Sequence, residues 1–113
     1  MINIPNVVLI TGATGVIGPR VVHALYQAGY QIRAFSVDVP ALGLFPPHVE
    51  VVIGDVTDEA AVQSAIQGVD AIIHLAALLH IVNPPPELRE KYERINVSGT
   101  ATVVEAATLL MDF

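Results

Sequence analysis

The chain has 113 residues, which is enough for one domain, and it combines 53% hydrophobic residues with a net charge of −6 at neutral pH. The negative charge argues against a nucleic-acid or anionic-membrane partner. The chain has no cysteine, which excludes disulfides and thiolate metal sites, and its start lacks the basic residues of a signal peptide, so we expect a cytoplasmic protein.

The first half of the chain predicts two strands separated by a helix. Residues 7–10 form a short β-branched run, typical of a strand that is buried on both faces. Residues 15–29 predict a helix that stops at Gly29, and residues 32–36 predict the second strand. A loop rich in proline and glycine follows over residues 37–48. The apolar face expected for the helix consists of Val16, Ile17, Val21, Val22 and Leu25.

The second half predicts two more strands and two helices. Residues 49–53 and 69–74 have strand character, and between them Thr57 or Asp58 can cap a short helix that runs through residue 67 and stops at Gly68. The apolar stretch 71–82 is too short to span a bilayer and indicates a strand followed by a loop. Residues 87–110 predict a long helix. Its apolar stripe consists of Leu88, Tyr92, Ile95, Gly99, Val103, Ala106 and Leu110.

Strands that alternate with helices predict an α/β fold with a parallel sheet and right-handed crossovers. The expected architecture has three layers and the strand order 3-2-1-4, which is the first half of a doubly wound fold. We therefore expect residues 1–113 to form a single domain that is incomplete at its C-terminus. The high apolar content suits a piece whose faces are normally covered by further chain or by a partner subunit.

Three glycines, each three residues after the last, lie between the first strand and the first helix. Gly12 permits the tight turn out of the strand, Gly15 lets backbone N–H groups approach a pyrophosphate, and Gly18 lets the helix pack close to the sheet. The field of the helix N-terminus favours phosphate charge at the same place. The alternative is a glycine-rich turn that binds nothing. The expected phosphate-loop contacts come from Gly12, Thr14, Gly15, Val16, Ile17 and Gly18.

Four segments in chain order carry a family resemblance. Residues 11–18, 54–58, 70–77 and 96–100 read TGATGVIG, GDVTD, DAIIHLAA and NVSGT. They resemble the T-G-x-x-G-x-x-G, acidic-turn, D-x-V-x-H-x-A-A and N-V-x-G-T motifs of the extended short-chain dehydrogenases. These are the NAD-dependent epimerase/dehydratase and 3β-hydroxysteroid dehydrogenase relatives. The resemblance implies a Rossmann-type fold and a dinucleotide cofactor.

The resemblance also implies roles for single residues. Asp55 would accept a hydrogen bond from the adenine amino group, and Val56 would pack on the adenine ring. Asn96 would hold active-site backbone or a water chain. The small side chains expected beside the diphosphate and the nicotinamide ribose belong to Leu75, Ala76 and Ala77. The alternatives are a turn or helix-cap residue at Asp55 and an ordinary helical polar residue at Asn96.

Two further residues have a structural interpretation. A lone histidine at a strand end is mostly structural, so we expect no catalytic role for His74. Gly99 within a helix costs about 1 kcal/mol against alanine, which indicates a close backbone approach against the neighbouring strand.

The end of the second strand normally selects between NAD and NADP, through an acidic residue for the ribose hydroxyls or an Arg for the 2′-phosphate. Here that position is Ser36, which is neither, and Asp38 lies two residues further on. No Lys or Arg follows Ser36 until Arg89, which favours NAD over NADP. Arg20 and Arg33 are the remaining cations that could serve a phosphate.

Catalysis in the resembled family uses a Tyr-x-x-x-Lys pair with a Ser or Thr. None of Tyr26, Tyr30 and Tyr92 is followed by lysine at that spacing. We therefore predict the NAD(P)-binding N-terminal portion of such an oxidoreductase, inactive by itself, whose small-molecule substrate binds only a full-length form. The apolar loop 78–86 favours a hydrophobic substrate. The alternatives are a non-catalytic regulatory or interaction module and a fragment without function, and we expect self-association through the exposed sheet edge.

Overall fold

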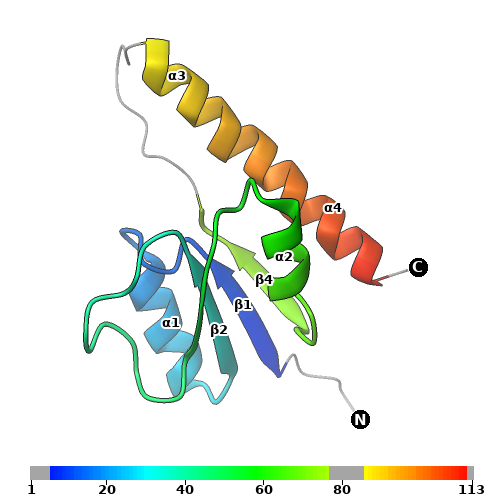
Figure 1. The fold of residues 1–113 in the computed structure, drawn as a ribbon. Helices are drawn as coiled ribbons and strands as arrows, with labels where there is room; N and C mark the ends of the chain where they lie inside the picture. Colours follow the sequence, from blue (N-terminus) through cyan, green and yellow to red (C-terminus); the bar gives the residue numbers. More distant parts are fainter. Residues whose placement is uncertain (1–5, 77–85, 112–113) are drawn as a thin grey trace.

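A parallel four-stranded sheet forms the centre of the computed structural model, which describes residues 6–76 and 86–111. Its strand order is β3-β2-β1-β4, as the sequence predicts. The helices lie on both faces of the sheet, so the three-layer α/β fold is also confirmed (Figure 1). The elements are β1 (Val7–Thr11), α1 (Gly18–Gln27), β2 (Gln31–Ser36), β3 (Glu50–Ile53), α2 (Glu59–Ala65), β4 (Ala71–His74), α3 (Pro86–Tyr92), η1 (Glu93–Gly99) and α4 (Thr100–Met111).

Alternating side chains of the central strands build two separate cores. Val8 and Ile10 of β1 pack with Val22 of α1 on one face of the sheet. Leu9 points to the other face, where it joins Val103 of α4 in a second apolar cluster. The period of two along β1 explains why a continuous apolar run is needed here: both faces of this strand are covered by helices.

Helix α1 begins later than the sequence pattern predicts. Its first residue is Gly18, not Gly15, and Pro19 follows in the first turn, where a missing N–H and a fixed φ are tolerated. Val16 and Ile17 are 77% and 55% exposed, so the prediction that they belong to the apolar helix face is wrong. Both residues lie in the turn before the helix.

Asp58 is the residue that caps α2. Its carboxylate oxygen accepts a hydrogen bond from the backbone N–H of Ala61 at 3.2 Å. The other candidate, Thr57, instead donates its hydroxyl to Asp55. Helix α2 ends at Ala65, two residues before the predicted end, and Gly68 follows in the left-handed conformation with φ of 78°.

The long C-terminal helix is continuous, but it is not α-helical throughout. Residues 93–99 form the π-helical segment η1 between α3 and α4. Figure 1 shows the three segments as one rod across the sheet. Apolar spacing predicts the helix but does not distinguish the wider π-turn from the α-turn. Within residues 6–76 and 86–111, no helix is both long and apolar enough to cross a membrane.

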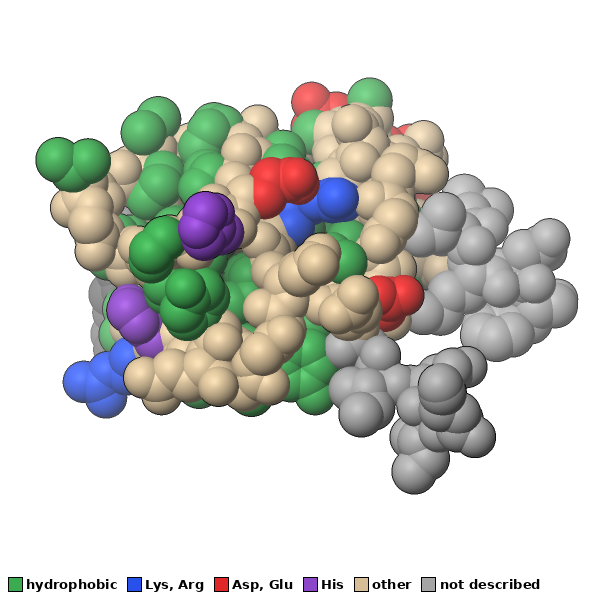
Figure 2. Space-filling view, turned by 90° about the horizontal axis from the view of Figure 1, so that it is seen from below, with side chains coloured by type: hydrophobic (Ala, Val, Ile, Leu, Met, Phe, Trp, Pro, Cys, Tyr) green, Lys and Arg blue, Asp and Glu red, His purple; other side chains and the backbone are tan. Residues whose placement is uncertain are grey.

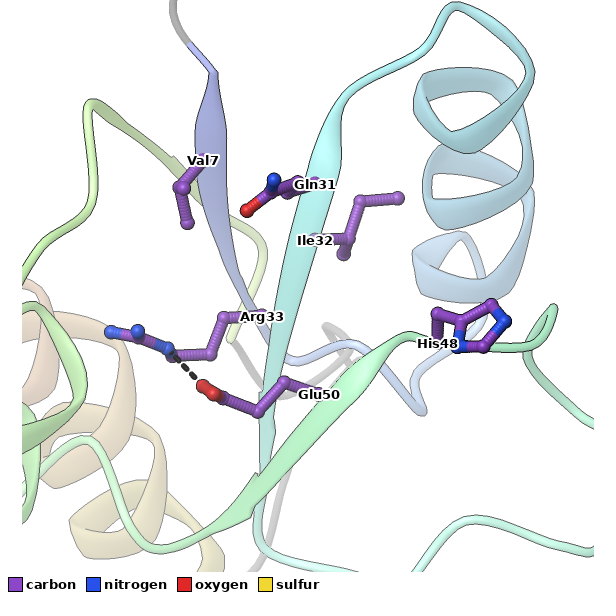
Figure 3. A pocket seen from close by; sticks show the side chains of 6 residues that line it. All are labelled: Val7, Gln31, Ile32, Arg33, His48 and Glu50. Atoms are coloured by element: carbon purple, nitrogen blue, oxygen red, sulfur yellow. Dashed lines mark hydrogen bonds and ion pairs between the residues drawn. The ribbon is translucent and has the colours of Figure 1, made fainter.

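One arginine joins three elements at the amino ends of the strands. Arg33 of β2 forms an ion pair with Glu50 of β3 (Figure 3). Its Nη1 also donates to the carbonyl oxygens of Ala65 at 2.5 Å and Gln67 at 2.6 Å. Arg33 and Glu50 also line a hollow of about 380 Å³, together with Val7, Gln31, Ile32 and His48. Figure 2 views this end of the molecule, where scattered charged side chains lie among both hydrophobic side chains and uncharged polar or backbone surface. Arg33 is therefore engaged in the fold and is removed from the candidates for phosphate binding.

Arg33→Met should lower the free energy of unfolding by about 2 kcal/mol, because two backbone carbonyls lose a charged donor. Glu50→Gln removes the ion pair but keeps both carbonyl contacts. Since the Glu50 side chain is 55% exposed, its loss should be below about 1 kcal/mol. Urea denaturation of the two variants measures the difference. If both substitutions lowered the free energy of unfolding equally, the carbonyl contacts of Arg33 would not be its main contribution to stability.

Candidate functional site

The carboxyl ends of the strands surround a cleft of about 470 Å³. One wall comes from the glycine-rich turn and the ends of β2, β3 and β4, and the other comes from α3 and η1. Its lining residues are Gly12, Thr14, Gly15, Phe35, Ser36, Val37, Asp38, Gly54, Asp55, Val56, Leu75, Ala76, Lys91, Arg94 and Ile95. Most of the predicted site residues are therefore brought together, although they come from four separate segments of the chain.

A few predicted site residues are not among those that line the cleft. Gly18 is buried at the start of α1, and Val16 and Ile17 are exposed beside it. Asn96 lies half-buried in η1, next to the lining residue Ile95. Ala77 lies outside the described residues.

The turn between β1 and α1 depends on close backbone packing. Gly12 has φ of +65°, and a Cβ there would lie 2.7 Å from the backbone N of Ala76. A Cβ on Gly18 would lie 2.3 Å from the carbonyl oxygen of Ala13. Neither position can take a side chain without moving backbone. The tight turn and the close packing expected of these two glycines are thus present, and the packing partner of Gly18 is the turn itself.

Gly15 differs from the other two glycines because it is exposed in the cleft. Its N–H donates to the carbonyl of Gly12 at 3.0 Å, which closes the turn. The following N-cap position of α1 is Ile17, which has no side chain able to cap, and no side-chain hydrogen bond is made there. The positive end of α1 is therefore uncapped by side chains, an arrangement suited to an anionic ligand.

At the end of β2, Ser36 is 3% exposed and its hydroxyl donates to the carbonyl oxygen of Asp38 at 2.7 Å. This bond curls the chain immediately after the strand. Asp38 is exposed and lines the cleft together with Ser36. The chain therefore curls after β2, and both residues border the same cleft.

Asp55 forms the turn after β3 and remains available for further hydrogen bonding. Its Oδ1 accepts from the backbone N–H and the hydroxyl of Thr57, at 2.9 and 2.7 Å. These bonds from Thr57 lower the pKa of the Asp55 carboxyl, the Arg94 charge adds to the effect, and burial opposes it. Because a carboxylate has about four acceptor positions, the turn role and an amine-binding role are compatible.

Val56 packs against the π-helical segment. It is 4% exposed, and a Cβ on Gly99 would lie 2.7 Å from its Cγ2. The close approach predicted at Gly99 is thus observed, but the prediction that its neighbour is a strand is wrong: the neighbour is a side chain in the turn after β3. Little of Val56 is left uncovered for contact with a ring.

His74 lies at the centre of a polar network beneath the cleft. Its Nδ1 is 2.6 Å from the Thr11 hydroxyl, and its Nε2 is 3.0 Å from the Thr100 hydroxyl. The Thr11 hydroxyl oxygen also accepts from the N–H groups of Leu75 at 3.0 Å and Ala76 at 3.2 Å. Burial lowers the pKa of the His74 imidazole below its ordinary 6.5.

Lys91 and Arg94 are lining residues that the sequence reasoning missed. They bring positive charge to the cleft from α3 and η1. Their spacing of three places them on one side of a helix, and three of the five basic residues of the chain fall between positions 89 and 94. This local concentration of cations was the available signal, but separation along the chain from Ser36 made them look remote from the cofactor.

The fold and the cleft define a Rossmann-type dinucleotide-binding domain. Comparison with known proteins gives the family: residues 8–110 match the NAD dependent epimerase/dehydratase family. The chain belongs to this family, which supports a nicotinamide dinucleotide as the cofactor of the cleft.

Curated proteins similar to this chain include a dehydrogenase and a reductase. The chain is 33% identical over 102 residues to a 3-beta-hydroxysteroid dehydrogenase of Mycolicibacterium neoaurum, covering 88% of this chain and 28% of the relative. It is 38% identical over 103 residues to a 3-diazoavenalumate denitrifying reductase of a Streptomyces species, covering 88% of this chain and 33% of the relative. The chain therefore spans about a third or less of the length of these relatives.

Solved structures agree with the fold. A short-chain dehydrogenase/reductase superfamily protein from Agrobacterium tumefaciens with bound NAD superimposes with a TM-score of 0.78 at 33% identity, covering 92% of this chain and 29% of that one. The L-threonine dehydrogenase of Clostridium difficile gives a TM-score of 0.81 at 30% identity, covering 96% and 35%.

The lowered pKa of His74 predicts a pH effect on stability. The unfolded chain binds a proton near pH 6.5, whereas the folded chain binds it only at lower pH. The stabilising contribution of neutral His74 is therefore complete above about pH 6.5 and decreases as the pH falls from there through the folded pKa. Urea denaturation between pH 7.5 and 5 should show a steeper loss for the wild type than for His74→Gln. Parallel profiles would contradict the assignment.

Proposed function

We propose that this chain is the coenzyme-binding part of an NAD(P)-dependent oxidoreductase, with NAD as the coenzyme. The observation that carries the proposal is the cleft in which Gly12 and Gly15 expose backbone at the uncapped start of α1, and which the carboxylate of Asp55 also lines. This combination suits two parts of the ligand: the diphosphate at the turn and the adenine amine at the carboxylate.

The residues present fit a dinucleotide. Backbone N–H groups of the turn would hold the diphosphate. Asp38 would bind the adenosine ribose, and Asp55 would bind the adenine amino group. Leu75 and Ala76 would lie beside the part of the coenzyme that leads to the nicotinamide. When bound, the nicotinamide supplies a hydride donor or acceptor. Protein groups contribute position and charge: the glycines leave room for the phosphates, and the hydrogen bonds from Thr57 stabilise the ionised form of Asp55.

NAD is the proposed coenzyme because the segment that follows β2, residues 37–48, contains no Lys or Arg, whereas the carboxylate of Asp38 in that segment lines the cleft. Structures similar to this chain include proteins with bound NAD. A phosphate beside Asp38 would meet like charge, so NADP should bind more weakly than NAD.

For the whole enzyme we propose a dehydrogenase that acts on a hydrophobic alcohol. Curated relatives include 3-beta-hydroxysteroid dehydrogenases and a sterol-4-alpha-carboxylate 3-dehydrogenase, at 31 to 33% identity. The apolar loop 78–86, on which the sequence argument for a hydrophobic substrate rests, lies outside the described residues except for Pro86.

Calorimetric titration of the full chain with NAD and NADP tests the proposal. NAD should bind, and NADP should bind at least about threefold more weakly. Gly15→Val should abolish binding by placing a branched side chain where the phosphates lie. Its Cβ would lie 3.2 Å from the carbonyl oxygen of Gly12, a milder contact than the 2.7 Å and 2.3 Å contacts at Gly12 and Gly18. Gly68→Asn, a replacement at a left-handed position outside the cleft, is the matched control and should bind like the wild type. A wild-type chain that binds neither coenzyme would overturn the proposal.

Lys91 and Arg94 add positive charge to a cleft that must hold an anion, so we propose that they attract the two phosphates common to NAD and NADP. The double variant Lys91→Gln/Arg94→Gln should weaken both coenzymes by a similar factor of about five to tenfold at low ionic strength, and by less at high salt.

Arg89→Gln provides the control for long-range charge. Arg89 is an exposed residue of the same helix and does not line the cleft. It should leave the affinity nearly unchanged. A loss confined to NADP would place the two cations at the 2′-phosphate, and an equal loss from Arg89→Gln would reduce their effect to net charge; either result would contradict the proposal.

A further inference from the structure

The hydrogen bonds around His74 have a single direction. A carbonyl oxygen can only accept a hydrogen bond, so the Thr100 hydroxyl donates its one proton to the carbonyl oxygen of Asn96, 2.8 Å away. Toward His74 Nε2, at 3.0 Å, the same hydroxyl can then only accept. The proton of the neutral imidazole is therefore on Nε2.

The other side of the ring follows by the same reasoning. With its proton on Nε2, neutral His74 presents a lone pair at Nδ1, and the Thr11 hydroxyl donates to it over 2.6 Å. Both lone pairs of that hydroxyl oxygen remain available to accept the N–H groups of Leu75 and Ala76. One chain of bonds thus runs from Thr11 through His74 and Thr100 to the carbonyl of Asn96.

Each end of this chain of bonds belongs to one wall of the cleft. Thr11 precedes Gly12, and the amides that it binds belong to Leu75 and Ala76, which line the cleft. The Asn96 carbonyl lies in η1, between the cation Arg94 and the packing residue Gly99. His74 is the only group that joins the two walls by hydrogen bonds in this network, because Thr11 and Thr100 each bind a different nitrogen of its ring.

We propose that His74, as its Nε2–H tautomer, is a positioning residue for coenzyme binding that sets the glycine turn and the η1 wall at the spacing the dinucleotide requires. This inference rests on the proposed function of the cleft. A proton on Nδ1 would oblige the Thr11 hydroxyl to accept from the ring, and the oxygen would then lose one of the two amides that it holds at the end of β4. The peptide units that border the ligand would turn as a result.

The first test is spectroscopic and needs no coenzyme. Long-range ¹H–¹⁵N correlation spectra of the full chain at pH 7.5 should show the His74 ring protonated at Nε2 only, with His74→Gln identifying its signals. A ring protonated at Nδ1, or an equal mixture of the two tautomers, would overturn the inference.

The second test uses affinity, with hydroxyls removed and restored. Thr11→Val and Thr100→Val each break one link at nearly constant volume and should weaken NAD binding by about tenfold. Thr11→Ser and Thr100→Ser keep the hydroxyl and should recover most of that loss. Thr108→Val removes a similar hydroxyl-to-carbonyl bond, to Val104 at 2.8 Å, outside this network and should change nothing.

Circular dichroism and denaturation midpoints restrict the comparison to chains that are folded at the assay temperature. If folded Thr11→Val and Thr100→Val bind NAD as the wild type does, His74 is only a core residue and the inference falls while the proposed function stands. If the wild type binds no coenzyme, both fall.

Discussion

Backbone packs directly on backbone where β1 passes into α1, and the arrangement of the cleft depends on this contact. Gly12 lies against the peptide between Leu75 and Ala76, and Gly18 lies against the carbonyl of Ala13. Side chains at these positions would push the start of α1 away from the sheet. With hydrogen in their place, the positive end of the helix and the ends of β1 and β4 meet within one small volume, and a charged ligand can reach all of them.

The second wall of the cleft is positioned by different forces. Val56 fills the space left by Gly99, which joins the turn after β3 to η1 by van der Waals contact. The hydrogen bonds of His74 connect the same helical segment to the end of β1. One apolar and one polar connection therefore hold the two walls together, and the charge of Arg94 on the helix helps to lower the pKa of the Asp55 carboxyl in the turn after β3.

The strand order, the glycine turn and the acidic turn could all be predicted because each depends on local patterns: continuous apolar runs, fixed glycine spacing and an Asp after a strand. Features set by three-dimensional contact could not. Val16 and Ile17 continue the apolar pattern of α1, but Pro19 and the close contact of Gly18 start the helix after them. Gly99 signalled a close neighbour without revealing that the neighbour is Val56. Lys91 and Arg94 are far from Ser36 in the sequence, so the sequence alone did not indicate that they lie near it. The long helix crosses the sheet and brings them to the same cleft as Ser36.

The π-helical segment η1 changes the direction in which the long rod presents its residues. In the wider turn, successive side chains rotate less about the axis than in an α-helix, so residues after Gly99 lag behind the positions that a regular helix would give them. The leading part of the rod can thus direct Lys91 and Arg94 at the cleft while the trailing part keeps Val103 and Ala106 on the core. A single uninterrupted element thereby contributes to two surfaces, the cleft through Lys91 and Arg94 and the core through Val103 and Ala106, without a break in its main chain.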